Sequence, residues 1–299
     1  MVMSDQKKGF LITVMGVLLV VPDSLFVRLI SSDPIVTSFW RSASAGSLVL
    51  LGILAFYGAS GFRNLRMMGW LGWLYTLLIG STAPAFVFAV THTSVASVVF
   101  ILASMPIFSA AFSYIFLKET IELRNLVTIF LVILGLSFVC FGSINSDISS
   151  WRGDVWALYV SIAYAGALTV TRRLKSLSVI PAIPFGYIGA ALVMTFFVDP
   201  FSDFSINWVL YLVYGGFIAL GTCLLAIGPR FISSPEVALL ILLEAVLAPL
   251  LVWFVLNENP GHWTLIGGGI VIFSLLISNI IALGRVDQSK AKKNRSRKN

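Results

Sequence analysis

The sequence predicts an all-α integral membrane protein whose ten transmembrane helices form two inverted five-helix repeats. Of the 299 residues, 58% are hydrophobic and only 11% are charged, whereas soluble domains carry about a quarter charged residues. Apolar stretches of about 17 to 24 residues, the length that crosses a bilayer, follow one another along the chain. Basic residues collect in every second connection between these stretches. A soluble chain this apolar could not cover its own surface with polar groups.

The apolar stretches and the tails that flank them account for the whole chain. The predicted spans cover residues 9–30, 35–57, 68–90, 95–117, 125–143, 153–171, 182–198, 207–228, 235–256 and 263–283. The predicted units are a cytoplasmic N-terminal tail at 1–8, a first repeat at 9–143, a second repeat at 153–283 and a basic cytoplasmic tail at 284–299. No connection is long enough to form a soluble domain.

The distribution of Lys and Arg predicts which way the chain crosses the membrane. With the N-terminus in the cytoplasm, 17 basic residues lie on the inner side and only Arg152 lies in an outer loop. Cytoplasmic loops carry such an excess of Lys and Arg. We therefore expect a multi-pass protein of a cell inner membrane with both termini cytoplasmic. Seven basic residues lie between Arg285 and Lys298; this tail favours lipid contact over nucleic-acid binding, for which a basic folded face is missing.

A shift of 139 residues aligns the two halves of the chain. Glu119, at the end of the fourth stretch, then falls on Glu258 at the end of the ninth, and Ile133 falls on Ile272. In both halves two closely spaced helices precede a charged turn and a last helix. Because five is an odd number, the halves must have opposite orientations. Inverted repeats of this kind place a binding site between the halves, near the membrane midplane.

Segments of both halves carry a resemblance to a known family. They are the run from Ser94 through Pro106 to Lys118-Glu119, Pro235-Glu236-Val237-Ala238-Leu239-Leu240 with Leu243-Glu244 and Asn257-Glu258, Pro22-Asp23-Ser24-Leu25 with Arg28-Leu29, and Pro34 with Phe39-Trp40-Arg41. In these segments the chain resembles EamA-type members of the drug/metabolite transporter superfamily, over nearly all of residues 9–284. It departs from the family at Ala245, where proline is usual, and at Lys118 and Asn257, which replace glycine.

The resemblance implies a ten-helix transporter with both termini in the cytoplasm that exports or exchanges small metabolites. It also implies that helices 1–4 and 6–9 surround a central cavity while helices 5 and 10 lie outside. Substrates vary widely within the family, so the resemblance does not name one for this chain.

Two glutamates of the ninth predicted helix are candidates for substrate binding or ion coupling. Glu244 lies near the middle of the helix among apolar residues, and ionisable groups at such depth usually face the protein interior and serve function. It could alternatively tie the helix to a neighbour. Glu236 lies eight residues earlier, a rise of about 12 Å and a rotation of roughly 80°, so both can share one face. Glu236 could alternatively cap the helix start.

The first two predicted helices supply further candidates. Asp23 follows Pro22 past the middle of the first helix, and proline kinks a helix because it has no N–H to donate. This Pro-Asp break could contact a ligand or form a gate, or Asp23 could pair with Arg28 or Arg41. Arg41 could attract an anionic group or extend to the outer interface. Pro106, predicted in the middle of the fourth helix, is a second candidate for gating.

These residues favour a secondary transporter, an exporter or exchanger of a small organic metabolite that works by alternating access. One or two carboxylates and an arginine would suit an amino acid or related zwitterion. The expected partners are a small-molecule substrate and the lipid bilayer, with proton or other ion coupling and a homodimer left open. We expect no metal, no cofactor and no enzymatic motif such as HExxH or GxSxG. The alternative is a lipid-handling or structural membrane protein without solute transport.

Overall fold

The computed structural model describes most of the chain. It covers residues 5–30, 32–92, 98, 101–102, 104–120, 123–142, 151–201, 204–256, 262–263, 265–274 and 277–278. The regular elements in these residues are helices: α1 (Asp5–Val20), α2 (Asp23–Ile30), α3 (Pro34–Tyr57), α4 (Arg63–Met67), α5 (Gly69–His92), α7 (Met105–Phe112), α8 (Leu123–Gly142), α9 (Trp151–Arg173), α10 (Ile183–Met194), α11 (Phe204–Ile227) and α12 (Ser234–Leu256). Short 3₁₀ or π turns join several of them.

Six helices in the described residues are long and apolar enough to cross a membrane. They are Asp5–Val27, Pro34–Met67, Gly69–Val90, Trp151–Arg173, Asn207–Arg230 and Ser234–Leu256. Shorter apolar helices cover Met105–Leu117, Leu123–Gly135, Ile180–Met194 and Leu265–Ser274. The chain is therefore a multi-pass membrane protein. The predicted basic tail at 284–299 lies outside the described residues.

The first predicted helix is broken at Pro22. Helix α1 ends at Val20, a turn follows, and α2 begins at Asp23. The break occurs where a proline cannot donate to the carbonyl four residues earlier. The Phe26 amide donates to the Pro22 carbonyl at 2.9 Å, which starts the new helix. At its other end α1 begins at Asp5, so residues 5–8, predicted in the tail, continue the helix.

The fourth predicted helix differs from its prediction at Pro106. The sequence analysis placed this proline in the middle of a helix, but it lies in the first turn of α7, which begins at Met105. Proline suits this position because a first-turn amide has no helical acceptor. The helix ends in a π turn, Ser113–Leu117, followed by Lys118 in a left-handed conformation with φ of 55°.

Helices from the two predicted halves alternate in the interior. Helix α5 packs on α9 and α10, α3 packs on α10 and α11, and α1 packs on α11 and α12. The backbones of α5 and α10 approach closely at Gly80 and Gly186. A Cβ atom added to Gly186 would lie 2.7 Å from the Thr76 carbonyl oxygen, so only glycine permits this backbone contact.

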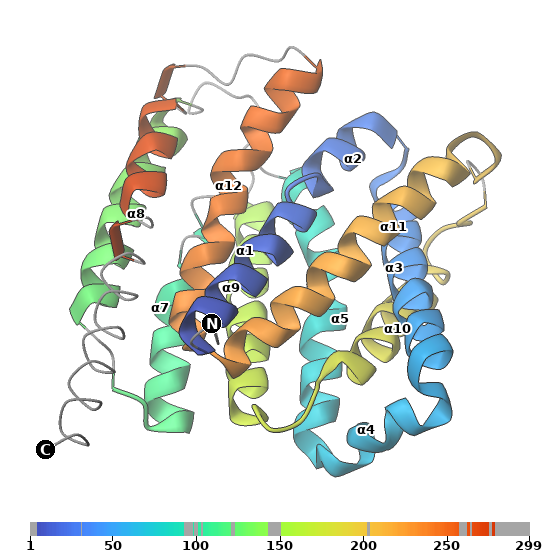
Figure 1. Ribbon diagram of the computed structural model, residues 1–299. Coiled ribbons are helices and arrows are strands. Elements are labelled where there is room, and N and C mark those ends of the chain that lie inside the picture. Colours follow the sequence, from blue (N-terminus) through green and yellow to red (C-terminus); the bar gives the residue numbers. More distant parts are fainter. Residues whose placement is uncertain are drawn as a thin grey trace, which may run out of the picture.

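Helix α8 and the helical residues 265–274 lie together at one edge of the molecule (Figure 1). Val132 of α8, Leu242 of α12 and Val271 form a small core that joins this edge to the rest. A Cβ atom on Gly135 would lie 2.9 Å from the Gly267 carbonyl oxygen. The edge position agrees with what the family resemblance implies for the fifth and tenth helices.

Candidate functional site

A buried ion pair joins the first two candidates, Asp23 and Arg41. Arg41 Nη2 donates to Asp23 Oδ2 at 2.6 Å, and Arg41 Nε donates to Asp23 Oδ1 at 3.2 Å. Only 3% of Asp23 and 8% of Arg41 are exposed. Pairing with Arg41 was one of the two alternatives for Asp23; the other, Arg28, has a side chain outside the described part. The bidentate geometry offsets the cost of burying both charges.

Tyr214 of α11 contacts both members of this ion pair. Its hydroxyl donates to Asp23 Oδ1, and the Arg41 guanidinium carbon lies 5.9 Å from its ring centroid. The ring also stacks on Phe26 at a centroid distance of 5.1 Å and an interplanar angle of 19°. Asp23 therefore holds α2, α3 and α11 together through two donors. Two predicted halves contribute to this single cluster.

Glu244 of α12 lies close enough to Asp23 and Arg41 to interact electrostatically with both. It is ten residues after Ser234, so it lies about 15 Å along the helix, near the middle of a hydrocarbon layer about 30 Å thick. Its side chain is only partly buried. Within the described residues, no hydrogen bond to its carboxyl group is found. The carboxyl group of Glu244 thus has unused hydrogen-bonding capacity near the Asp23–Arg41 ion pair.

Tyrosines that the sequence analysis did not single out surround these charges. Tyr164 of α9 lies near Glu244, Arg41 and Tyr187. The Tyr187 hydroxyl lies 3.0 Å from Thr222 Oγ1 in a buried contact between α10 and α11. A signal was present in the sequence, because membrane tyrosines concentrate at the interfaces and these lie inside their spans. We call Asp23, Arg41, Glu244, Tyr164 and Tyr214 the central cluster.

Glu236 lies apart from the central cluster and caps α12. Its Oε2 accepts from the Ser233 amide at 3.0 Å and from the Ser233 hydroxyl at 2.9 Å, the glutamate half of a capping box. Its Oε1 accepts from Arg124 Nη2 at 2.5 Å. Arg124 Nη1 donates at 3.0 Å to the Ser278 carbonyl. These contacts favour the capping alternative for Glu236 and join three helices at one end of the molecule.

The two candidate gating prolines differ in their relation to the central cluster. Pro22 directly precedes Asp23 and separates α1 from α2. Pro106 lies at the start of α7, next to Ser104, whose hydroxyl lies 2.9 Å from the Ser161 hydroxyl of α9. In the described part of the chain, no group of three or more His, Cys, Asp or Glu side chains could hold a metal ion.

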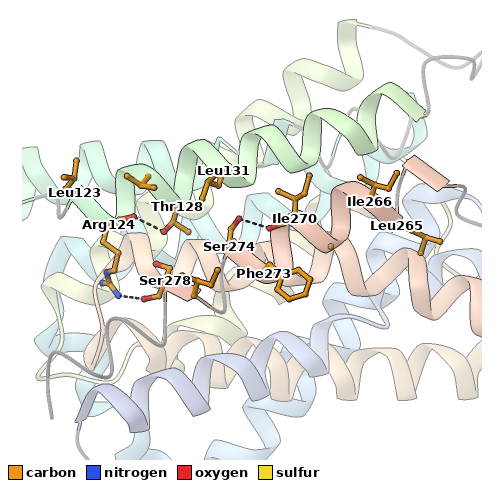
Figure 2. A pocket seen from close by; sticks show the side chains of 13 residues that line it. Leu123, Arg124, Thr128, Leu131, Leu265, Ile266, Ile270, Phe273, Ser274 and Ser278 are labelled. Atoms are coloured by element: carbon orange, nitrogen blue, oxygen red, sulfur yellow. Dashed lines mark hydrogen bonds between the residues drawn. The ribbon is translucent and has the colours of Figure 1, made fainter.

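A groove of about 750 Å³ lies between α8 and the helical residues 265–274 (Figure 2). Its walls are mostly apolar, and Leu123 and Phe273 on its rim are 75% and 67% exposed. Arg124 enters only at one end, where it is held by Ser278 and Glu236. The groove lies at the edge of the molecule and has the character of a lipid-facing surface, so it is not the candidate site.

The architecture agrees with comparisons to known proteins. The sequence model of the EamA-like transporter family matches residues 7–141 and 151–280. This chain belongs to the EamA-like transporter family. The family is part of the drug/metabolite transporter superfamily, as the resemblance implied. A protein of Synechocystis sp. (strain ATCC 27184 / PCC 6803 / Kazusa), named "Uncharacterized transporter sll1164", is 25% identical over 279 residues, which are 86% of this chain and 80% of that protein.

The fold of this EamA-like chain is also similar to that of a protein whose crystal structure has been solved. The two superpose with a TM-score of 0.77 and 15% sequence identity, over 92% of this chain and 98% of the other. At this identity the likeness concerns the fold alone. The family and the spans together identify a multi-pass membrane transporter.

Proposed function

We propose that the protein is a secondary transporter that moves a small organic solute by alternating access between two inverted five-helix halves. The central cluster would bind the solute, and Glu244 would couple its movement to a proton or another ion. The proposal includes ten spans, formed by the six long helices and the four shorter ones. It also includes an inner-membrane location with cytoplasmic termini, for which the distribution of Lys and Arg is the support.

The pattern of helix contacts supports the inverted repeat. If α1, α3, α5 and α7 of the first half correspond to α9, α10, α11 and α12 of the second, exchanging the halves should preserve the contacts. The pair α1–α11 becomes α9–α5, α3–α11 becomes α10–α5, and α1–α12 becomes α9–α7; all six pairs are in contact. The pairs α3–α10 and α7–α12 map onto themselves and are also in contact, whereas α3–α5 and α9–α12 have no matching contact of similar extent among the described residues. The family match in two stretches, one in each half, points the same way.

The observation that carries the proposal is Glu244 beside the Asp23–Arg41 pair at mid-membrane depth. Burying three charged groups at this depth is costly unless they serve function. The ion pair satisfies Asp23 and Arg41, but Glu244 retains carboxylate oxygens for a solute amine or a proton. A zwitterion, such as an amino acid, would place its ammonium on Glu244 and its carboxylate toward Arg41. Secondary transport, which is driven by a gradient of an ion or of the substrate, fits a chain without a P-loop for ATP.

Counterflow in proteoliposomes tests the proposal. Vesicles loaded with a pooled panel of unlabelled amino acids, nucleosides, sugars and amines are diluted into the labelled compounds, and uptake is followed. We expect saturable exchange of one class and its loss in Glu244→Gln. If Glu244→Gln keeps full flux driven by a pH gradient, the coupling role is wrong. If folded, inserted protein exchanges nothing in the panel, solute transport is contradicted and lipid movement becomes the function to measure.

A further inference from the structure

A second cavity, which is polar, lies at the end of the molecule where α1 begins. It has a volume of about 500 Å³ and is lined by Gln6, Ser113, Lys118, Glu119, Thr120, Asn125, Arg172, Phe231, Ile232, Ser233, Pro235 and Glu236. We call it the end pocket. Its walls come from both predicted halves, and in the proposed orientation it faces the cytoplasm. Its volume lies in the range of small-molecule sites.

Three buried oxygen atoms of the end pocket have no hydrogen-bond partner within the described residues. They are Ser113 Oγ, Glu119 Oε2 and Asn125 Oδ1. Ser113 is 2% exposed and Asn125 is 4% exposed, so water at the surface does not satisfy them. Leaving such a group unpaired costs about 1–3 kcal/mol. All three oxygens belong to residues that line one cavity, and a ligand that donates hydrogen bonds would satisfy them.

Two arginines beside the end pocket already hold its glutamates, which defines the ligand further, and Lys118 also lines the pocket. Arg172 Nε donates to Glu119 Oε1 at 2.9 Å, and Arg172 Nη1 donates to the Pro229 carbonyl at 3.3 Å. Glu236 is held by Arg124 at 2.5 Å. Each of the two arginines therefore already pairs with a carboxylate, Arg172 with Glu119 and Arg124 with Glu236. The unused atoms are oxygens, and Glu119 Oε2 belongs to a carboxylate.

Backbone geometry fixes these oxygens in place. Ser113 begins the π turn that ends at Leu117, and the left-handed residue Lys118 stops the helix. The Glu119 amide donates to the Ser113 carbonyl at 3.3 Å, which keeps the two side chains on one short segment. π turns within helices are frequent at functional sites. Asn125 approaches from the first turn of α8.

We propose that the end pocket binds the protonated primary amine of the transported solute at the cytoplasmic entrance, ahead of the central cluster. The three N–H donors of an ammonium match the three unpaired oxygens in number and in kind. Phe231, Ile232 and Pro235 provide an apolar wall for the rest of the solute. The assignment rests on the proposed transport function for its role, but binding of the amine itself can be measured separately.

Calorimetric titration of the purified full-length protein in detergent tests the site. The probe is 3-methylbutylamine and the matched control is 3-methylbutanol, which has the same shape without the charge; choline chloride holds the ionic strength constant. We expect saturable heat for the amine only. Asn125→Leu/Ser113→Ala should weaken amine binding by about tenfold or more, because hydrogen bonds to a charged donor are lost. The unliganded double variant should melt no lower than wild type, because it removes unpaired polar atoms.

Glu244→Gln distinguishes this site from the central cluster. We expect it to keep amine binding while losing counterflow. Undetectable binding to the wild type, equal binding of the alcohol, or equal binding by the Asn125→Leu/Ser113→Ala variant would overturn the proposal. So would binding lost in Glu244→Gln and kept in the double variant, because the amine would then occupy the central cluster. A wild type that binds the amine but shows no counterflow would contradict transport and leave the end pocket standing.

Discussion

Arg41 donates two hydrogen bonds to the two carboxylate oxygens of Asp23, although the residues are 18 positions apart and lie on different helices. Both side chains are almost fully buried. Their pairing fixes α2 against α3 where Pro22 has interrupted the first span. Unfolding measurements on variants of this ion pair can therefore be compared with separate counterflow measurements of transport.

Removing one partner of the Asp23–Arg41 pair should be more harmful than removing both charges. Arg41→Met leaves Asp23 buried and unpaired, which costs about 3–5 kcal/mol. Asp23→Asn/Arg41→Met leaves no charge, and the asparagine can still accept from Tyr214, so its unfolding free energy should recover in part. Thermal and denaturant unfolding in detergent measure this. A double variant less stable than Arg41→Met would contradict the compensation.

Tyr214→Phe should lower stability by about 1.5–3 kcal/mol, the range for a hydrogen bond to a charged acceptor. The substitution removes the donor to Asp23 but keeps the ring that stacks on Phe26 at 5.1 Å. Tyr187→Phe is the matched control, because its hydroxyl contacts the neutral Thr222 hydroxyl at 3.0 Å and should contribute only about 0.5–1.5 kcal/mol. If both variants lose the same free energy of unfolding, the charge of Asp23 does not strengthen the hydrogen bond from Tyr214.

Glu236→Gln and Glu244→Gln should have opposite effects. Glu236→Gln removes the negative charge that pairs with Arg124 at 2.5 Å, so the unfolding temperature should fall while counterflow per folded protein stays within about twofold of wild type. Glu244→Gln should abolish exchange and leave the unfolding temperature unchanged or higher, since it removes a charge from mid-membrane depth. Unfolding scans and counterflow on the same preparations compare the two. Loss of exchange in Glu236→Gln at normal stability would place Glu236 on the transport path.

Gly186→Ala should destabilise the protein by several kcal/mol, while Gly189→Ala on the same helix should not. An added Cβ at Gly186 would meet the Thr76 carbonyl at 2.7 Å and Ile79 Cγ2 at 3.1 Å, whereas nothing lies within 4 Å of the same atom at Gly189. Overpacking of a rigid backbone contact typically costs about 1–3 kcal/mol or more. The yield of monodisperse protein and its unfolding temperature report the difference. Equal behaviour of both variants would show that α5 and α10 separate easily.

The spans could be predicted from the sequence because the bilayer imposes both a length and an apolar composition on each helix. The break at Pro22 followed from the missing N–H of proline. The start of α7 at Met105 could not be predicted in this way, because proline occurs both inside membrane helices and in their first turns. Residues 95–97, at the start of that predicted span, lie outside the described part.

The central cluster could be predicted only in its charged members. Asp23, Arg41 and Glu244 were evident because charge is rare inside a span. Tyr214 lies 191 residues from Asp23, and no local pattern connects such distant positions. For Glu236, its position at the start of the predicted helix allowed a cap, but the contact with Arg124 depends on how α8 packs beside α12. Residues that are far apart in the sequence, such as Asp23 and Tyr214, come into contact where the two predicted halves meet.

The turn at Val21–Pro22 also determines how Asp23 can move. On an unbroken helix, Asp23 could move only together with α1. Helix α1 is packed against α11, where Gly16 lies close to Leu225. Asp23 instead begins an eight-residue helix with its own axis. Because the helix is interrupted at this turn, we expect that a change in the Asp23–Arg41 pair can reorient α2 without disturbing the contact between α1 and α11.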